Sequence, residues 1–196
     1  IKAGADVVVL DGMQGGTAAT QDVFIENVGQ PTLACIRPAV QALHDLKVKG
    51  KVQLIISGGI RTGADVAKAL ALGADAVSLG TAALVALGDN DPIWETEYQK
   101  LGTSAGSFDA WHEGLDPAGI TTQDPKLEAR LDPILGGRKI KNYLNVLKLE
   151  LQTLARACGK SDVCNLEPED LCALTVEAAA MAGVPLAGTD WIPGQN

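Results

Sequence analysis

The sequence predicts an α/β protein, namely the C-terminal part of a (β/α)8 TIM barrel with its last parallel strands, followed by a helical C-terminal extension. Hydrophobic residues make up 46% of the 196 residues and aromatic residues only 4%, which indicates aliphatic, glycine-rich packing. Two stretches, KAGADVVVLDG at 2–12 and ALGADAVSLGT at 71–81, share a helix end, a glycine and a short apolar run. A third apolar run lies between them at 52–57. Uninterrupted apolar runs separated by helices are typical of a parallel sheet buried on both faces.

Capping and periodicity predict the helices that accompany these strands. Thr62 is an N-cap candidate for a helix that stops at Gly73. The apolar face of that helix comprises Val66, Ala69 and Leu70. A second helix is expected at 33–46, although Pro38 should kink or delay it. The stretch TAALVALG at 81–88 predicts a short helix after the last strand.

The strand pattern stops after Gly80, and the sequence predicts two units. Residues 1–88 form the barrel part, and residues 89–196 form a loop segment and a helical extension that packs on it. A polar segment runs from about Asp89 to Gly137, and apolar residues at helical spacing then predict a long amphipathic helix. These residues are Ile140, Tyr143, Leu144, Leu147, Leu151, Leu154 and Cys158. Glu167-Pro168 is expected to open a final helix, because proline is tolerated in a first turn. Its apolar residues are Leu171, Leu174, Ala178 and Met181.

Three parallel strands cannot close a barrel, and residues 1–3 resemble the last turn of a helix. We therefore expect the chain to be the C-terminal part of a larger (β/α) protein of roughly 250 residues or more. The alternative is an open three-stranded sheet, which would leave apolar strand edges unpaired.

The formal net charge of −8, from 16 basic and 24 acidic residues, argues against nucleic acid as a partner. The apolar runs are shorter than the roughly 20 residues of a membrane span, and no leader pattern opens the chain, so no membrane partner is expected. Four cysteines at uneven spacing do not suggest a secreted disulfide scaffold. They indicate a cytoplasmic protein whose cysteines are small buried side chains. They are Cys35, Cys158, Cys164 and Cys172.

The last two predicted strands end in Gly58-Gly59 and Gly80-Thr81. In barrel enzymes the loops after the final strands commonly bind phosphate, because glycine admits an anion close to the backbone and free N–H groups at a helix start favour negative charge. Ile60 lies within the first turn, and Arg61 could add a charge-assisted contact. The alternative is that these glycines only form tight turns between strand and helix.

Four stretches resemble known families. Residues 56–82 resemble the closing units of several barrel families, including inosine-monophosphate dehydrogenases and FMN-dependent oxidoreductases. DGMQGGTAATQ, at 11–21, resembles the glycine-rich loop of the FMN-binding synthase domain of glutamate synthases, and DPAGITTQDP, at 116–125, resembles the segment after that domain's last barrel unit. The tail at 156–191 resembles the end of the glutamate-synthase-like subunits of N-methylglutamate synthases, which are methylamine–glutamate N-methyltransferases.

This resemblance implies an FMN-dependent subunit of a multi-subunit synthase. It would convert glutamate and methylamine to N-methylglutamate and ammonia through 2-iminoglutarate. The FMN phosphate would lie at Gly58, Gly59, Ile60, Arg61, Gly80 and Thr81. The substrate would lie at Gln14, Gly15, Gly16 and Thr17. Asp11 could engage an amine or only cap its turn, and no catalytic residue is assigned.

The sequence departs from the glutamate synthase pattern at two places. Glutamate synthases have an aspartate where Gln14 stands. Two cysteines of their iron-sulfur cluster correspond to Trp111 and Asp116, and no cysteine lies between Cys35 and Cys158, so an Fe-S cluster cannot form at the usual position. Exchange of ammonia for methylamine on glutamate is redox-neutral and needs no external electrons, so this departure favours the N-methyltransferase.

The remaining titratable residues suggest no further site. The spacing of Cys158, Cys164 and Cys172 matches no standard Fe-S run, and Cys158 and Cys172 fit apolar helix faces. His44 and His112 have no cysteine or carboxylate at ligand spacing, so no metal site is predicted.

Three alternatives to the N-methyltransferase stay open. They are a glutamate synthase that aminates 2-oxoglutarate, a nucleotide enzyme similar to inosine-monophosphate dehydrogenase, and a non-catalytic barrel fragment. The nucleotide enzyme would require a catalytic cysteine loop, and none follows the strand at 7–10.

Overall fold

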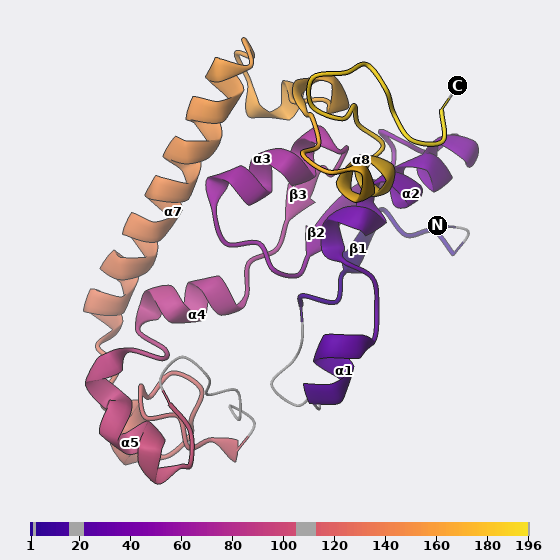
Figure 1. Ribbon diagram of the computed structural model, residues 1–196. Coiled ribbons are helices and arrows are strands. Elements are labelled where there is room, and N and C mark those ends of the chain that lie inside the picture. The colour runs from indigo at the N-terminus through magenta and orange to yellow at the C-terminus, as the bar shows by residue number, and fades with distance from the viewer. Residues whose placement is uncertain (2, 16–21, 105–112, 196) are drawn as a thin grey trace.

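The computed structural model describes residues 1, 3–15, 22–104 and 113–195, and these form a mixed α/β structure (Figure 1). The strands are β1 (Val7–Asp11), β2 (Gln53–Ser57) and β3 (Ala76–Val77). The helices of the first half are α1 (Asp22–Asn27), α2 (Thr32–Asp45), α3 (Gly63–Ala71) and α4 (Thr81–Leu87). Those of the second half are α5 (Glu95–Lys100), α6 (Pro125–Glu128), α7 (Pro133–Ala157) and α8 (Val176–Ala182). Short 3-10 turns cover Pro92–Trp94, Val163–Asn165 and Pro168–Asp170.

Within the described residues the sheet has three parallel strands, as predicted, and their order is β1-β2-β3. Val7 pairs with Gln53 at the start of β1, and Asp11 pairs with Ser57 at its end. β3 is shorter than the apolar run suggested, with Ile55 opposite Ala76 and Ile56 opposite Val77. Because the strands are parallel and in register, their carboxyl ends meet at one edge.

The expectation of a sheet buried on both faces is wrong for the described residues. Leu54 and Ile56 of β2 are buried against a core that α2 and α3 contribute to. On the other face of β1, Val7 and Val9 are 42% and 59% exposed. The physical reason is that the described helices that cover the sheet pack on one face only.

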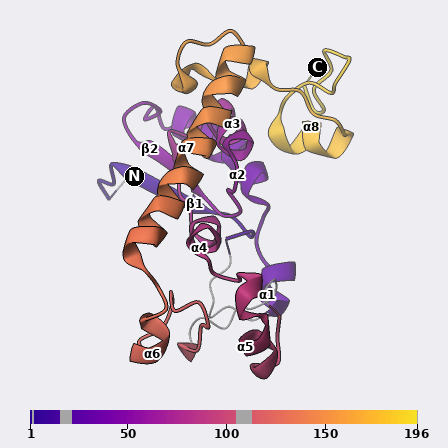
Figure 2. The same cartoon turned by 90° about the vertical axis from the view of Figure 1, so that its left-hand side faces the viewer.

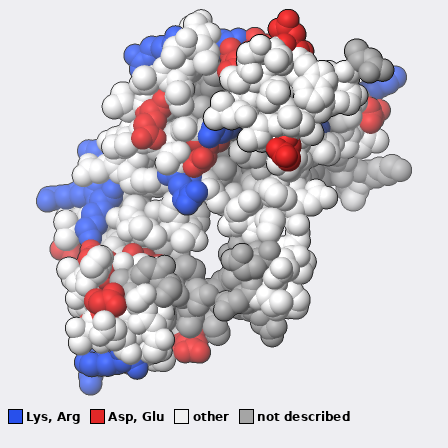
Figure 3. Space-filling view, in the orientation of Figure 1, with Lys and Arg blue, Asp and Glu red and all other residues white. Residues whose placement is uncertain are grey.

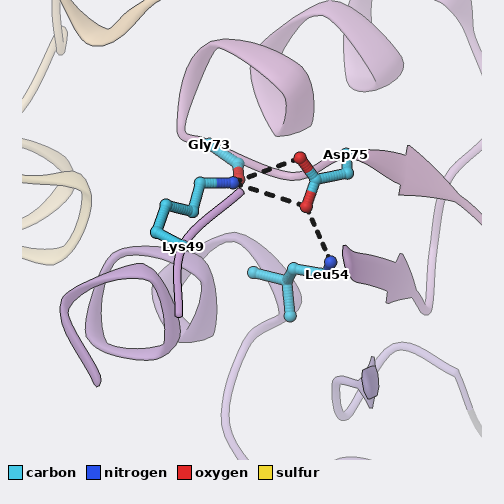
Figure 4. Close-up of polar contacts among 4 residues, drawn as sticks. All are labelled: Lys49, Leu54, Gly73 and Asp75. Carbon is cyan, nitrogen blue, oxygen red and sulfur yellow. Dashed lines mark hydrogen bonds and ion pairs between the residues drawn. The ribbon is translucent and has the colours of Figure 1, made fainter. Parts of the chain in front are cut away.

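At the edge opposite the carboxyl ends of the strands, the Asp75 carboxylate connects the starts of β2 and β3 (Figure 4). Asp75, just before β3, accepts a hydrogen bond from the Leu54 amide at 2.7 Å. It also pairs with the Lys49 ammonium at 3.2 Å, and that ammonium donates to the Gly73 carbonyl at 3.0 Å. This end of the sheet is therefore closed by polar contacts.

Among the helices of the first half, α3 begins where its capping residue predicted. Thr62 caps α3 through a reciprocal capping box with Asp65, and Val66 and Ala69 on its inner face are buried. Pro38 does not delay α2, which begins at Thr32 and continues through the proline. Burial of Ile36, Val40 and Leu43 on one side of α2 stabilises the helix despite the lost backbone hydrogen bond.

The polar segment from Asp89 to Gly137, which we expected to be a loop, is partly helical. It contains α5, α6 and the first turns of α7. α7 starts seven residues before Ile140, because the Asp132 carboxylate accepts from the amides of Ile134 and Leu135 at 2.8 and 3.1 Å. Figure 2 shows α7 running past α3 and α4, and its Leu151 and Ala155 are buried against α3.

A continuous final helix from Glu167 is also wrong. A 3-10 turn at Pro168–Asp170 ends in extended backbone, and α8 starts only after Thr175, which caps it through the Ala178 amide. The intervening Ala173 pairs in parallel with Leu186, and Leu174 is 85% exposed. Backbone pairing with the later segment therefore replaces helix at this point.

In the described part of the chain, no helix combines the length and the apolar character that a membrane crossing requires.

Candidate functional site

A pocket of about 810 Å³ lies at the carboxyl edge of the three strands. Its walls come from the loop after β1, the turn after β2, the residues after β3, and helices α4 and α7. Its lining residues are Asp11, Gln14, Gly15, Ser57, Gly58, Gly59, Ile60, Arg61, Ser78, Gly80, Thr81, Ala82, Val85, Ala86 and Tyr143. The volume is in the range of small-molecule sites, and this edge is where ligands bind in open α/β sheets.

The loops after β1 and β2 require glycine partly because they pack against each other. Gly58 and Gly59 have φ of +106° and +73°. A Cβ at Gly59 would lie 2.7 Å from the Gln14 Cβ, and one at Gly15 would lie 2.2 Å from the Asp11 carboxylate oxygen. The two turns therefore pack together as one compact unit. This packing requires glycine whether or not a ligand also requires it.

Some polar groups of Gln14 and Gly15 already form hydrogen bonds within this unit. The Gln14 side-chain oxygen accepts from the amide and the hydroxyl of Thr32 at 2.7 and 2.8 Å. The Gly15 amide donates to the Gly12 carbonyl at 2.9 Å. Gln14 can therefore offer its NH2 group to a ligand, whereas Gly15 makes room for the Asp11 side chain.

We expected free N–H groups at the start of α3, but those of residues 61–63 are hydrogen-bonded. The amides of Arg61 and Thr62 donate to the Asp65 carboxylate at 3.1 and 3.0 Å. The Gly63 amide donates to the Glu150 carboxylate of α7 at 2.8 Å. Two carboxylates thus occupy this helix start, so an anion cannot use these amides without displacing them.

The start of α4 is open by comparison. Gly80 caps it without a side-chain hydrogen bond, and its first turn contains no acidic residue. A Cβ at Gly80 would meet no atom within 4 Å among the described residues, so space remains beside this turn. A phosphate group would therefore fit at Gly80-Thr81 rather than at the start of α3.

The charges that line the pocket are few. Among its described lining residues, Arg61 is the one cation and Asp11 the one carboxylate. Figure 3 shows basic side chains along the lower part of α7, where the sequence has Arg138, Lys139 and Lys141. The described lining of the pocket itself is therefore balanced between one cation and one carboxylate.

Tyr143 is a pocket residue that sequence reasoning missed. Its hydroxyl donates to the Arg61 carbonyl at 2.8 Å, across 82 residues of sequence. Burial raises the pKa of Tyr143, and the charges of Asp65 and Glu150 add to the increase, so the phenol keeps its proton at neutral pH. The periodicity of α7 marked Tyr143 only as an apolar-face residue, and no local signal could have placed it at this turn.

The structure brings most of the predicted site residues to this pocket. All six predicted phosphate residues line it, as do Gln14 and Gly15. Gly16 and Thr17 lie outside the described residues. That these residues bind a cofactor or a substrate stays a prediction.

Asp116, one of the two positions that correspond to cluster cysteines, has a structural role. It is fully buried, and its carboxylate accepts from the amides of Ala118, Ile120 and Thr121 at 2.9, 2.9 and 3.1 Å. The Asp116 side chain therefore organises the turn at 116–121 and is saturated with donors. Trp111 lies outside the described residues.

The predicted burial of the cysteines is wrong. Cys158, Cys164 and Cys172 are exposed, and Cys35 is partly buried. Cys158 follows the end of α7, and Cys172 lies in extended backbone, so neither has the apolar helix face expected of it. His44 is exposed at the end of α2, and His112 lies outside the described residues. Among the described residues, no three His, Cys, Asp or Glu side chains group as a metal site.

The fold and this pocket define an α/β protein with a small-molecule-sized pocket at the carboxyl edge of parallel strands. Comparison with known proteins gives the family: the model of the conserved region in glutamate synthase matches residues 1–91 and 105–161. The chain belongs to the glutamate synthase family.

Two relatives illustrate this membership. A glutamate synthase large subunit-like protein of Rhizobium meliloti (strain 1021) is 78% identical over 196 residues, which are all of this chain and 44% of that protein. An archaeal glutamate synthase (NADPH) of Methanocaldococcus jannaschii is 40% identical over 159 residues, 81% of this chain and 28% of that protein. The chain thus spans less than half the length of either relative.

A solved structure of a mutant flavocytochrome b2 with benzoylformate covers 83% of this chain and 34% of its own. The TM-score is 0.47 and the identity 18%, a likeness too weak to carry an argument.

Proposed function

We propose that this chain is the flavin-binding part of an FMN-dependent enzyme that makes N-methylglutamate and ammonia from glutamate and methylamine, through 2-iminoglutarate. The observation that carries the proposal is one pocket, lined by both glycine turns and the loop after β1, in a chain of the glutamate synthase family. The relative named as large subunit-like supports a multi-subunit enzyme.

The residues of the pocket fit the phosphate of FMN at one end. Gly80-Thr81 supplies an open helix start and a hydroxyl, and Arg61 supplies a guanidinium. When bound, FMN would accept a hydride from the amino-acid carbon of glutamate and return it to the methylimine. The protein's task is then to orient ring and substrate and to balance charge.

At the other end of the pocket, Asp11 would bind the amine. Its carboxylate lies at the end of β1, and the absent side chain of Gly15 leaves space for it. A carboxylate stabilises an ammonium or an alkylammonium group by a charge-assisted hydrogen bond. The NH2 group of Gln14 is available to a substrate carboxylate. Methylamine would add to the imine carbon as ammonia leaves, with no net electron transfer.

The turn at 116–121 favours this reaction over glutamate synthesis. Glutamate synthesis from 2-oxoglutarate requires imported electrons, and the Asp116 carboxylate, already saturated with backbone donors, stands where the family resemblance expects a cluster cysteine. The second candidate is a glutamate synthase, which the name of the relative at 40% identity favours.

We also propose that β1, β2 and β3 are the last strands of a (β/α)8 barrel, with residues 89–196 as its extension. The exposed apolar face of β1 supports this proposal, since a barrel would cover it.

The test uses the intact native protein with its partner subunits. We expect flavin absorption bands, anaerobic bleaching by glutamate, and recovery of colour when methylamine yields labelled N-methylglutamate by mass spectrometry. Stoichiometric consumption of a reductant while 2-oxoglutarate becomes glutamate would select the glutamate synthase instead. A colourless protein that takes up no added FMN would rule out both.

A further inference from the structure

α7 contacts the pocket from a distant part of the sequence. The helix packs along α3 and α4, which are the two helices whose first turns approach the pocket (Figures 1 and 2). Tyr143 of α7 is itself a lining residue.

Arg61 is fixed on both sides of its backbone. Its amide donates to the Asp65 carboxylate at 3.1 Å, and its carbonyl accepts from the Tyr143 hydroxyl at 2.8 Å. The first partner belongs to α3 and the second to α7. Both the backbone N–H and the backbone C=O of Arg61 are therefore hydrogen-bonded. Contacts with two separate helices fix the backbone position from which the guanidinium extends.

α7 lies directly against the start of α3. A Cβ at Gly63 would lie 2.4 Å from the Leu147 carbonyl oxygen and 2.7 Å from the Leu151 amide nitrogen. The Gly63 amide donates to Glu150, as described above. Backbone contact this close leaves little freedom for the turn to move relative to α7.

The same helix also contacts the end of α4. The Lys139 ammonium donates to the Leu87 carbonyl at 3.3 Å, which is a favourable position for a cation at a helix C-terminus. Gly136 is buried, and a Cβ there would lie 3.2 Å from a methyl carbon of Leu87. One helix therefore packs against both α3 and α4, the two helices that follow the turns at the phosphate end of the pocket.

We propose that α7 is a part of the cofactor site and that Tyr143 is a positioning residue, whose hydroxyl orients Arg61 toward the phosphate of FMN. The inference rests on the proposed FMN function and adds a residue to it. Arg61 would meet the phosphate, and Tyr143 would act only through Arg61. Preorganisation of this kind strengthens a charge-assisted contact, because the side chain loses less freedom on binding.

The test compares Tyr143→Phe with the unchanged intact protein, using FMN and riboflavin as probes. The substitution removes one hydroxyl and keeps the ring. Loss of one hydrogen bond predicts FMN affinity that is about threefold to tenfold weaker. Riboflavin has no phosphate, so its affinity should not change. Fluorescence titration of the apoprotein measures both.

Thr153→Val provides the matched control. It removes a hydroxyl from the same helix, where the bond goes to the Leu149 carbonyl one turn back. Both affinities should be unchanged in this variant.

The outcomes separate the two proposals. An unchanged FMN affinity in Tyr143→Phe, or an equal loss for FMN and riboflavin, would overturn the role of Tyr143 while the FMN function stands. An unchanged protein that binds neither flavin would overturn the proposed function, and this inference with it.

Discussion

Arg61 is the residue on which the charge of the candidate site depends, because it is the one cation among the described lining residues. Arg61→Gln should weaken FMN binding by about tenfold or more, since a hydrogen bond to a charged group contributes roughly 1.5–3 kcal/mol. Fluorescence titration measures the affinity. Lys68→Gln, on an exposed position of α3, is the control and should leave the affinity unchanged. Equal affinities of Arg61→Gln and the parent would place the phosphate elsewhere.

Asp116 is the residue that organises its turn. In Asp116→Asn, an NH2 group replaces one carboxylate oxygen that accepts hydrogen bonds from backbone N–H groups. The substitution should therefore lower the free energy of unfolding by about 1–3 kcal/mol. Urea unfolding of the purified protein measures the change. Asp124→Asn in the same segment is the control, because asparagine caps α6 as well as aspartate does. A neutral Asp116→Asn would contradict the structural role.

Among the elements, α7 and α3 form the closest packing beside the site. Gly63→Ala should lower the free energy of unfolding by about 1–3 kcal/mol, because the new methyl group meets the backbone of α7. Gly137→Ala is the matched control within α7. It has open space, so it should stabilise the protein by about 0.5–1 kcal/mol. Thermal unfolding of both variants measures the contrast, and a harmless Gly63→Ala would mean that α7 does not dock there.

α5 carries a titration that we expect to change stability at high pH. Burial of Tyr98, with the charges of Asp116 and Asp89, raises its pKa from 10.0 to about 12, although its bond from the Asn90 amide lowers it. The folded state therefore keeps this proton after the unfolded state has lost it. The contribution of the Tyr98 phenol to the free energy of unfolding is fully present below pH 10 and is lost as the pH rises toward 12.

Tyr98→Phe tests this titration. Between pH 10 and 12 the parent should lose up to about 1.4 kcal/mol more per pH unit than the variant, because one proton is involved. Urea midpoints across that range measure the slope. Parallel slopes would show that the phenol ionises equally in both states. At neutral pH the variant should also be somewhat less stable, since the Asn90 amide loses its acceptor.

At the scale of the whole molecule, the exposed face of β1 distinguishes a barrel from an open sheet. Val9 is 59% exposed in the described structure, and Val146 of α7 is 55% exposed. If a barrel covers the sheet in the intact protein, Val9→Lys should cost about 2 kcal/mol or more, because it buries a charge without a partner. Val146→Lys should be tolerated. Thermal unfolding of the two intact variants measures the loss of stability in each. Equal losses in Val9→Lys and Val146→Lys would favour the open sheet.

The sequence predicted the parallel strands, α3 with its cap at Thr62, and the clustering of the glycine turns. Each depends on a signal within a few residues: an apolar run, a capping residue or a glycine at the end of a strand. The carboxyl ends of parallel strands must meet, so the pocket followed from the order of the elements. The family membership was likewise available from local motifs.

Only the tertiary structure decided which groups at the site are already bound. Glu150 fills the start of α3 from 87 residues away, Tyr143 reaches Arg61 across 82 residues, and the segment around Ala173 pairs with Leu186 instead of continuing a helix. Such contacts depend on how helices pack together, and packing partners distant in sequence leave no mark in the local periodicity from which a single sequence is interpreted.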